Sequence, residues 1–126
     1  MNGPILKIHR LRYADEILLK DETRYISMTL CPKINIRDFE GISLITAYEK
    51  EYNLKLTNVE RTLGNTILTP NEEKNNFENE VPMAAFVLDG AVFCEPDQIV
   101  EIEHSYYRGD KYKFAVVAKP QLTLEK

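Results

Sequence analysis

The clearest structural signal in the sequence is residues 83–107, MAAFVLDGAVFCEPDQIVEIEHSYY. Two segments rich in β-branched and aromatic residues, 83–94 and 98–107, flank the turn-forming residues Glu95-Pro96-Asp97. This arrangement predicts two antiparallel strands joined by a short turn. Within the first segment, Asp89-Gly90 also has the local signature of a two-residue hairpin.

Further strands are predicted on both sides of this region, because apolar and polar residues alternate there. The polar step Ala14-Asp15-Glu16 indicates a hairpin between the first two strands, and Pro32 ends the second. A bend at Gly109-Asp110 precedes the last one. The predicted strands are residues 5–13, 17–29, 54–63 and 112–118.

Two helices are predicted between the strands. Residues 41–52 place Leu44, Ile45, Tyr48 and Tyr52 at helical spacing, and Asn53 is a suitable left-handed stop. Thr69-Pro70-Asn71-Glu72 has the residue types of a helix start, which predicts a short polar helix that ends near Asn76. Strands joined mainly by short turns, with few helices, predict an α+β fold built on an antiparallel β-sheet.

Length and composition indicate one globular domain over residues 1–126. The formal net charge of −4 argues against nucleic-acid binding by this chain itself. No apolar run is long enough to span a bilayer and the start is not a signal peptide, so we expect a cytoplasmic protein with Cys31 and Cys94 as reduced thiols. His9 and His104 lack zinc-site spacing and no common enzyme motif occurs, so we predict no metal, no cofactor and no catalytic residue.

The first predicted strand contains a pair of candidate ligand-binding residues. Arg10 and Arg12 share one face of it, about 7 Å apart, and two guanidinium groups at that spacing can converge on one phosphate or carboxylate. The alternative is a strand end where both arginines are solvated or paired with carboxylates. Glu22, in the neighbouring strand, is a candidate counter-ion for the arginines or an acceptor for a ligand hydroxyl, unless it is simply solvated.

Three further candidates come from other segments. In the strand over 98–107, the alternating set Val100, Ile102, His104 and Tyr106 is predicted to face the core. Glu101 and Tyr107 then face either water or a cavity. Ser43 lies near the start of the main predicted helix, where backbone N–H groups and a hydroxyl can bind an anion, although an ordinary helix-start role is the more common one.

A family resemblance adds to these local arguments. Residues 100–114, VEIEHSYYRGDKYKF, resemble the carboxy-terminal signature of the UTRA domain, the effector-sensing module of the HutC subgroup of GntR-type transcriptional regulators. Residues 9–15, HRLRYAD, and 22–26, ETRYI, resemble the family's R-x-R, turn and E-x-x-Y segment. Residues 39–44, FEGISL, and 48–52, YEKEY, resemble its Ser-Leu helix and the aromatic end of that helix.

The resemblance implies a chorismate-lyase-like α+β fold and a homodimer in the intact regulator. It implies a small effector, often a phosphorylated sugar or a carboxylate metabolite, whose binding modulates DNA binding. Carried over to this sequence, Arg10 and Arg12 would hold the anionic group with help from Ser43. Glu22, Glu101 and Tyr107 would contact the polar body of the effector.

The resemblance also bears on the points left open. It favours one strand through Asp89-Gly90, with Gly90 at a bulge or kink. The family's winged helix-turn-helix, through which DNA would be bound, and the opening part of the sensing domain have no counterpart in residues 1–126, and Asp15-Glu16 replaces the usual Asp-Gly turn. The alternatives are a dimerisation or interaction module without a working pocket and a chorismate-lyase-like enzyme.

Overall fold

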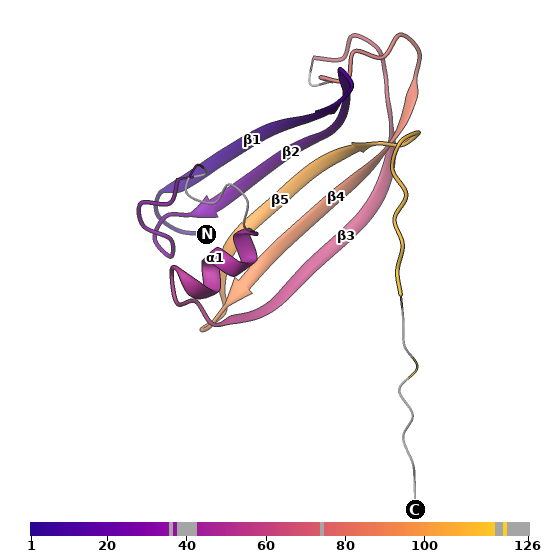
Figure 1. The fold of residues 1–126 in the computed structure, drawn as a ribbon. Coiled ribbons are helices and arrows are strands. Elements are labelled where there is room, and N and C mark those ends of the chain that lie inside the picture. Colours follow the sequence, from indigo (N-terminus) through magenta and orange to yellow (C-terminus); the bar gives the residue numbers. More distant parts are fainter. Residues whose placement is uncertain (36, 38–42, 74, 118–119, 121–126) are drawn as a thin grey trace, which may run out of the picture.

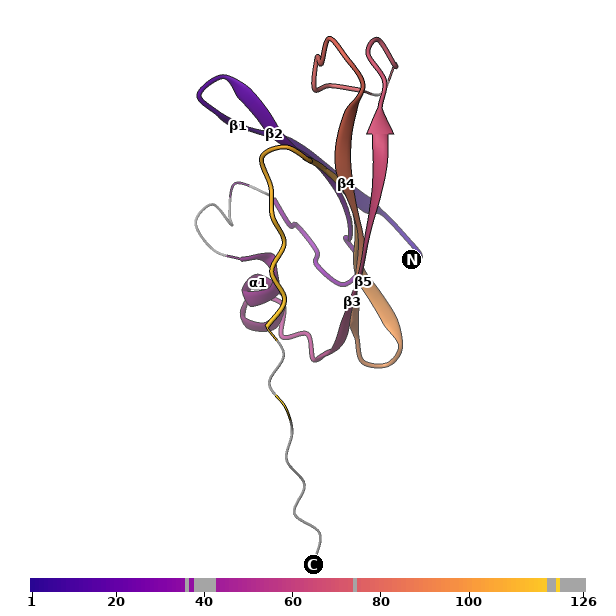
Figure 2. The ribbon, with the colours of Figure 1, turned by 90° about the vertical axis from the view of Figure 1, so that its right-hand side faces the viewer.

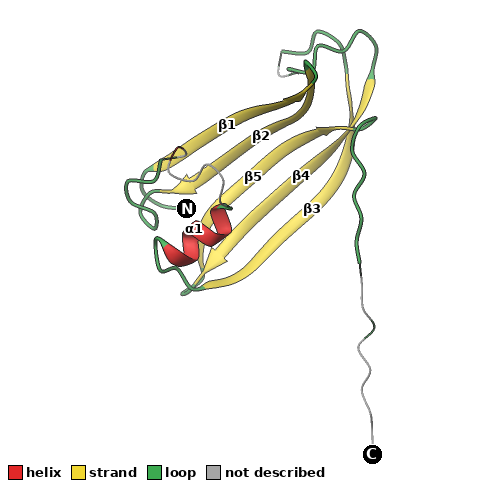
Figure 3. Cartoon of the chain, viewed as in Figure 1, coloured by secondary structure: helices red, strands yellow, loops and turns green. Residues whose placement is uncertain are grey.

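The computed structural model describes residues 1–35, 37, 43–73, 75–117 and 120. Its centre is a five-stranded antiparallel sheet in the order β1-β2-β5-β4-β3 (Figure 1). One short helix, α1, lies against it, so the predicted α+β fold is confirmed (Figure 3). The elements are β1 Ile5–Ala14, β2 Ile17–Ser27, α1 Leu44–Lys50, β3 Leu56–Leu68, β4 Met83–Cys94 and β5 Gln98–Arg108.

The two faces of the sheet differ in what covers them. Helix α1 and the described residues after β5 lie on the same side, which we call the inner face (Figure 2). The main core cluster is packed there, where Tyr48 of α1 meets Ile26 of β2 and Val100 of β5. Cys31 and Cys94 belong to this cluster as free, buried thiols. Burial raises the pKa of the Cys31 thiol to about 12.

Local backbone geometry fixes the β1–β2 hairpin. Asp15 and Glu16 both have positive φ angles, 48° and 67°, as a two-residue type I′ turn requires. The predicted hairpin is therefore confirmed, although neither residue is the glycine or asparagine that favours this turn. Asn53 has a φ of 51°, as expected of the left-handed stop after α1.

Strand β4 has the predicted limits and passes through Gly90 without interruption. The irregularity in its pairing with β5 lies between Val92 and Phe93, so the bulge predicted at Gly90 is wrong. A Cβ at Gly90 would lie 3.4 Å from the Glu60 carbonyl oxygen and 3.9 Å from Glu103 Cβ. The glycine thus marks a close approach between neighbouring strands rather than a kink.

Two predicted elements are corrected by the structure. Asn71 adopts a positive φ of 66°, which ends any helix begun at Pro70, and the described residues of 69–76 form turns instead. Of the strand predicted over 112–118, residues 112–117 do not form a strand, and residue 118 lies outside the described residues. The bend at Gly109-Asp110 would direct them back along β5, but both sides of β5 are already paired, with β2 and with β4.

The remaining differences concern element limits. Helix α1 is shorter than predicted, and residues 41 and 42 of the predicted helix lie outside the described residues. Strand β3 is longer than predicted and ends at Leu68. None of the helices formed by the described residues has the length and apolar character needed to cross a membrane.

Candidate functional site

Polar side chains from three adjacent strands meet on the inner face of the sheet. Arg10 of β1 lies opposite Glu22 of β2, and Glu22 lies opposite Ser105 of β5. In the next row, Arg24 of β2 lies opposite Glu103 of β5. Directly opposite residues of antiparallel strands point to the same face, so the register itself assembles these groups.

Arg24 connects three carboxylates. Its Nε donates to Glu22 Oε2 at 2.8 Å and its Nη1 donates to Glu101 Oε2 at 2.6 Å. Its Nη2 lies 3.3 Å from Glu103 Oε1. Each of these carboxylates belongs to a residue that is 3% exposed, so a single guanidinium provides charge to three buried anions.

Lys20 is the second buried cation of this group. Its Nζ lies 3.1 Å from Glu22 Oε1 and 3.8 Å from Glu103 Oε2. It also sits over the ring of Tyr107, 4.8 Å from the ring centroid, in a cation–π arrangement. The three buried carboxylates are thus matched by three cations: Arg10, Lys20 and Arg24.

The surroundings of Glu22 favour its ionised form. Burial raises the pKa of this carboxyl, but hydrogen bonds from Arg10 and Arg24 and the nearby positive charges outweigh burial and hold the pKa at about 2. For Arg24, burial lowers the pKa, and the charges of Glu101, Glu22 and Glu103 more than compensate and raise it. Glu22 is therefore held as a carboxylate in its ion pairs with Arg10 and Arg24.

Helix α1 joins the cluster through Tyr48. The hydroxyl of this fully buried residue donates to Glu101 Oε1 at 2.5 Å. Burial, followed by the charge of Glu101, raises the pKa of Tyr48, so the phenol stays protonated and acts as a donor. Glu101 is thereby joined to helix α1 by a direct hydrogen bond.

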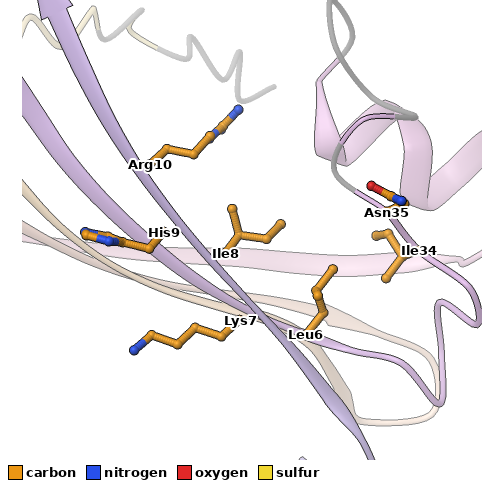
Figure 4. Close-up of a pocket in the computed structure, with 7 residues that line it drawn as sticks. All are labelled: Leu6, Lys7, Ile8, His9, Arg10, Ile34 and Asn35. Carbon is orange, nitrogen blue, oxygen red and sulfur yellow. The ribbon is translucent and has the colours of Figure 1, made fainter.

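A cavity of about 540 Å³ opens beside the cluster at the β1 edge of the sheet. Ile8 and Arg10 project from β1 toward Ile34 and Asn35, which follow β2, while Lys7 and His9 project to the other side (Figure 4). The Arg10 side chain is 45% exposed even though its Nη2 donates to Glu22 Oε2 at 2.6 Å. Its guanidinium therefore keeps N–H groups available to a molecule in the cavity.

The structure brings four of the six predicted ligand-binding residues into contact through two cations. Arg24 joins Glu22 to Glu101, Lys20 joins Glu22 to Tyr107, and Arg10 binds Glu22 directly. The counter-ion role predicted for Glu22 is confirmed by this last contact.

The other two predicted residues have different surroundings. Arg12 is exposed and, within the described ranges, makes no ion pair or side-chain hydrogen bond. Ser43 is the N-cap of α1, where its Oγ accepts from the Thr46 backbone N–H at 3.1 Å. The ordinary helix-start role is therefore the one that its contacts show.

The predicted face assignment of β5 holds for Val100, which is buried in the main core cluster, and is wrong for the residues after it. Glu101, Glu103 and Ser105 are buried there, whereas Ile102 is 39% exposed. The alternation of residue types indicated the opposite face, because it counted Glu as a solvent-facing residue. Cations on β2 reverse that expectation, since they compensate the buried carboxylates.

Sequence reasoning did not select Lys20, Arg24 or Glu103 as site residues. The signal was nevertheless present, because Lys20, Glu22 and Arg24 alternate along one face of β2 and Glu101 and Glu103 alternate along one face of β5. Pairing these two rows with opposite charges in register requires knowing that β2 and β5 are neighbours. Among the residues that the structure describes, no cluster of three or more His, Cys, Asp or Glu side chains is arranged to hold a metal ion.

Comparison with known proteins identifies one family and several solved structures with a similar fold. A family model of the UTRA domain matches residues 1–113. The structure resembles a GntR-family transcriptional regulator from Enterococcus faecalis, with a TM-score of 0.76, 19% identity, and coverage of 92% of this chain and 84% of that one. It also resembles the effector-binding domain of the trehalose repressor of Bacillus subtilis, with a TM-score of 0.72, 18% identity, and coverage of 94% and 81%.

One of the similar solved structures is much longer than this chain, which matches only part of it. The possible transcriptional regulator YydK from Bacillus subtilis gives a TM-score of 0.73 at 17% identity over 91% of this chain. The chain spans 50% of that protein. At these identities the likeness to solved structures establishes the fold.

Proposed function

This chain belongs to the UTRA domain family, and on that premise we propose that it is the effector-binding domain of a GntR/HutC-type transcriptional regulator that senses a small anionic metabolite. The observation that carries the proposal is the position of Arg10. Its guanidinium is anchored to a buried carboxylate on one side and lines a cavity of about 540 Å³ on the other. An arginine held in this way is preorganised for a phosphate or carboxylate group.

The remaining candidate residues have two proposed roles: some would bind the anionic group of the effector and the others its polar body. Arg12 lies two residues from Arg10 on β1 and adds a second guanidinium for the anionic group, and Ser43 would assist from the start of α1. Glu22, Glu101 and Tyr107 would contact the polar body of the effector. Of the six candidates only Arg10 lines the cavity, so effector contact by the buried carboxylates of Glu22 and Glu101 requires the effector to reach past it.

Regulation would follow from a population shift. An effector that binds one arrangement of a homodimeric regulator more tightly than another favours that arrangement, and the coupling equals the difference in binding free energy. DNA would be contacted through a winged helix-turn-helix domain outside this sequence. Such a regulator acts in the cytoplasm, where its operator DNA lies.

A thermal-shift panel of phosphosugars and small carboxylates tests the proposal. A ligand at a hundred times its dissociation constant stabilises the folded state by about 2.7 kcal/mol, which is a clear rise in Tm. The response should be lost in the double variant Arg10→Ala/Arg12→Ala. Arg61→Ala, which removes an exposed arginine from β3 at the other edge of the sheet, is the matched control and should respond like the original chain.

Two results would contradict the proposal. One is the absence of a response to every anionic metabolite in the panel. The other is an unchanged affinity of the double arginine variant for an effector identified in this way. Release of pyruvate from chorismate by the purified chain would instead support the lyase alternative.

A further inference from the structure

A second cavity lies on the face of the sheet opposite to helix α1, which we call the outer face. The side chains of Lys7 and His9 project away from the Arg10 cavity (Figure 4) and line this second one, which has a volume of about 400 Å³. That volume lies within the range of small-molecule sites. None of the six candidate effector-binding residues lines it. The outer-face cavity is therefore separate from the candidate site.

The register of three strands builds the floor of the outer-face cavity. His9 of β1 lies opposite Thr23 of β2, and Thr23 lies opposite His104 of β5. In the next row, Lys7 lies opposite Tyr25. Directly opposite residues of antiparallel strands point to the same face, so these five polar side chains gather on one surface. The floor is thus part of the rigid sheet.

Asp21 of β2 joins this floor to the loop between β3 and β4. The Asp21 residue is 6% exposed, and both of its carboxylate oxygens are occupied. Oδ1 lies 2.6 Å from His9 Nε2, and Oδ2 accepts from Asn76 Nδ2 of the loop at 2.8 Å. The loop is further anchored by Phe77, which is buried in a second core cluster with Leu18. The wall and the floor of the cavity are therefore held in place before any ligand binds.

Several polar groups of the cavity remain available to a ligand. His9 uses Nε2 for Asp21, which leaves Nδ1. The Lys7 ammonium lies 5.9 Å from the centroid of the Tyr25 ring and forms no ion pair within the described part of the chain. The hydroxyls of Thr23 and Tyr25 have no hydrogen-bond partner among the described side chains. An ammonium group only donates, whereas a hydroxyl both donates and accepts, so the cavity offers groups of both kinds.

The charges and the apolar surface of the cavity narrow the class of ligand. Lys7 supplies a positive charge, while Asp21 and Glu73 supply negative ones, so the lining does not select an anion. Among the described residues that line the cavity, none has an aliphatic apolar side chain. The rings of Tyr25 and Tyr106 supply its apolar surface, and each ring ends in a hydroxyl. This lining suits a neutral polar molecule better than an ion or a hydrocarbon.

We propose that the outer-face cavity binds a neutral polyhydroxylated molecule of about monosaccharide size. Each hydroxyl of such a ligand both donates and accepts, which matches the hydroxyls of Thr23 and Tyr25 and the free nitrogen of His9. The Lys7 ammonium donates to a ligand oxygen. The C–H surface of the ligand packs on the tyrosine rings. This site lies on the opposite face of the sheet from Arg10 and does not depend on the proposed effector.

The first test is an NMR titration of the full ¹⁵N-labelled chain with D-glucose, D-galactose and myo-inositol. At least one of these polyols should cause saturable shifts of the backbone amides of Thr23 and His104. Inorganic phosphate serves as the anionic probe and should bind there more weakly than that polyol. Saturable shifts with none of the three polyols, or tighter binding of phosphate at these amides, would overturn the proposal.

The second test locates the contacts with the polyol that gives the largest shifts. Thr23→Val keeps the shape of the side chain and should weaken binding about fivefold, because one hydrogen bond to the ligand is lost. Lys7→Met, at an exposed position, should weaken it by a similar factor. The matched control is Thr62→Val: Thr62 lies opposite Asp89 on the same face but outside the cavity, so affinity should stay the same.

Unchanged affinity of both Thr23→Val and Lys7→Met, in variants with an unperturbed NMR spectrum elsewhere, would place the ligand outside this cavity and overturn the proposal. Neither variant alters the Arg10 guanidinium, so the response to an anionic effector should persist in both. Failure of the outer-face site would therefore leave the proposed function standing.

Discussion

Arg24 occupies a position that no other cation in the described residues could fill equally well. Three of its nitrogens face three different carboxylates, those of Glu22, Glu101 and Glu103. The planar guanidinium fixes these directions, whereas an ammonium group would act as a point charge without fixed geometry. Two of the carboxylates are proposed effector contacts, so Arg24 determines where their oxygens lie. Arg24 is thus a positioning residue for the site.

Glu22 should give the domain a marked acid sensitivity. Its pKa of about 2 in the folded protein lies below the ordinary value of 4.5, so its ion pairs contribute stability that is present above pH 4.5 and lost as the pH falls toward 2. The contribution is on the order of 3 kcal/mol. Urea unfolding at a series of pH values from 7 to 2 measures it.

The control for this prediction is Glu22→Gln. The amide does not titrate, so the variant should be less stable at neutral pH and should lose less stability between pH 5 and pH 2. Equal pH dependence in the two proteins would mean that another carboxyl group causes the acid sensitivity.

At the scale of elements, the sequence predicts the β-hairpins correctly. It does not predict correctly the two segments outside the hairpins, the helix after Thr69 and the strand after Gly109-Asp110. The limits of β4 and the turn before β5 follow from local residue preferences, which agree with the pairing of neighbouring strands. The helix predicted at Thr69-Pro70-Asn71-Glu72 also had strong local signals. It fails because Asn71 takes a left-handed conformation, and the loop is held instead by asparagine side chains such as Asn79, which donates to the Leu68 carbonyl.

The candidate site was also only partly predictable from the sequence, but for a different reason. The face of β1 that carries Arg10 was predictable from alternation, and the pairing of Arg10 with Glu22 followed from the hairpin. The buried face of β5 was not, because Glu101 and Glu103 are buried only through contacts with β2, about 80 residues away along the chain. Alternation within a strand says which residues share a face, and the neighbouring strand decides which face is buried.

The β1–β2 turn offers a way to stabilise the hairpin. Asp15 and Glu16 both have positive φ, which costs energy for residues with a Cβ and is tolerated best by asparagine and glycine. Replacing them by Asn-Gly should raise the free energy of unfolding by about 1 kcal/mol. Chemical denaturation measures the change.

A glycine introduced at a position that does not have a positive φ provides the comparison. Glu60→Gly in β3, where φ is not positive, should lower stability by about 0.5–1 kcal/mol. Should the Asn-Gly variant prove no more stable than the original chain, the strain assigned to the turn would be absent.

At the scale of the whole molecule, the ion-pair cluster lies along the junction of two parts of the sheet. The β1–β2 hairpin forms one part and β3, β4 and β5 form the other. Every pairing between them in the described sheet is between β2 and β5. The contacts of Arg24 with Glu101 and Glu103 and of Lys20 with Glu103 cross this junction. The cluster therefore joins the two parts as well as forming the candidate site.

Removal of Arg24 should consequently destabilise the entire domain in one step. Arg24→Met leaves Glu101 and Glu103 buried without their main partner, and breaking a buried pair in this way costs about 3–5 kcal/mol. A domain of this size has a stability of about 5–15 kcal/mol, so a large part is lost. Arg12→Met, at an exposed position, should change stability by less than about 0.5 kcal/mol. Adding Glu101→Gln and Glu103→Gln to Arg24→Met should restore much of the loss in urea unfolding, because it removes the unpaired charges. Failure of that rescue would show that packing, not charge, makes Arg24 necessary.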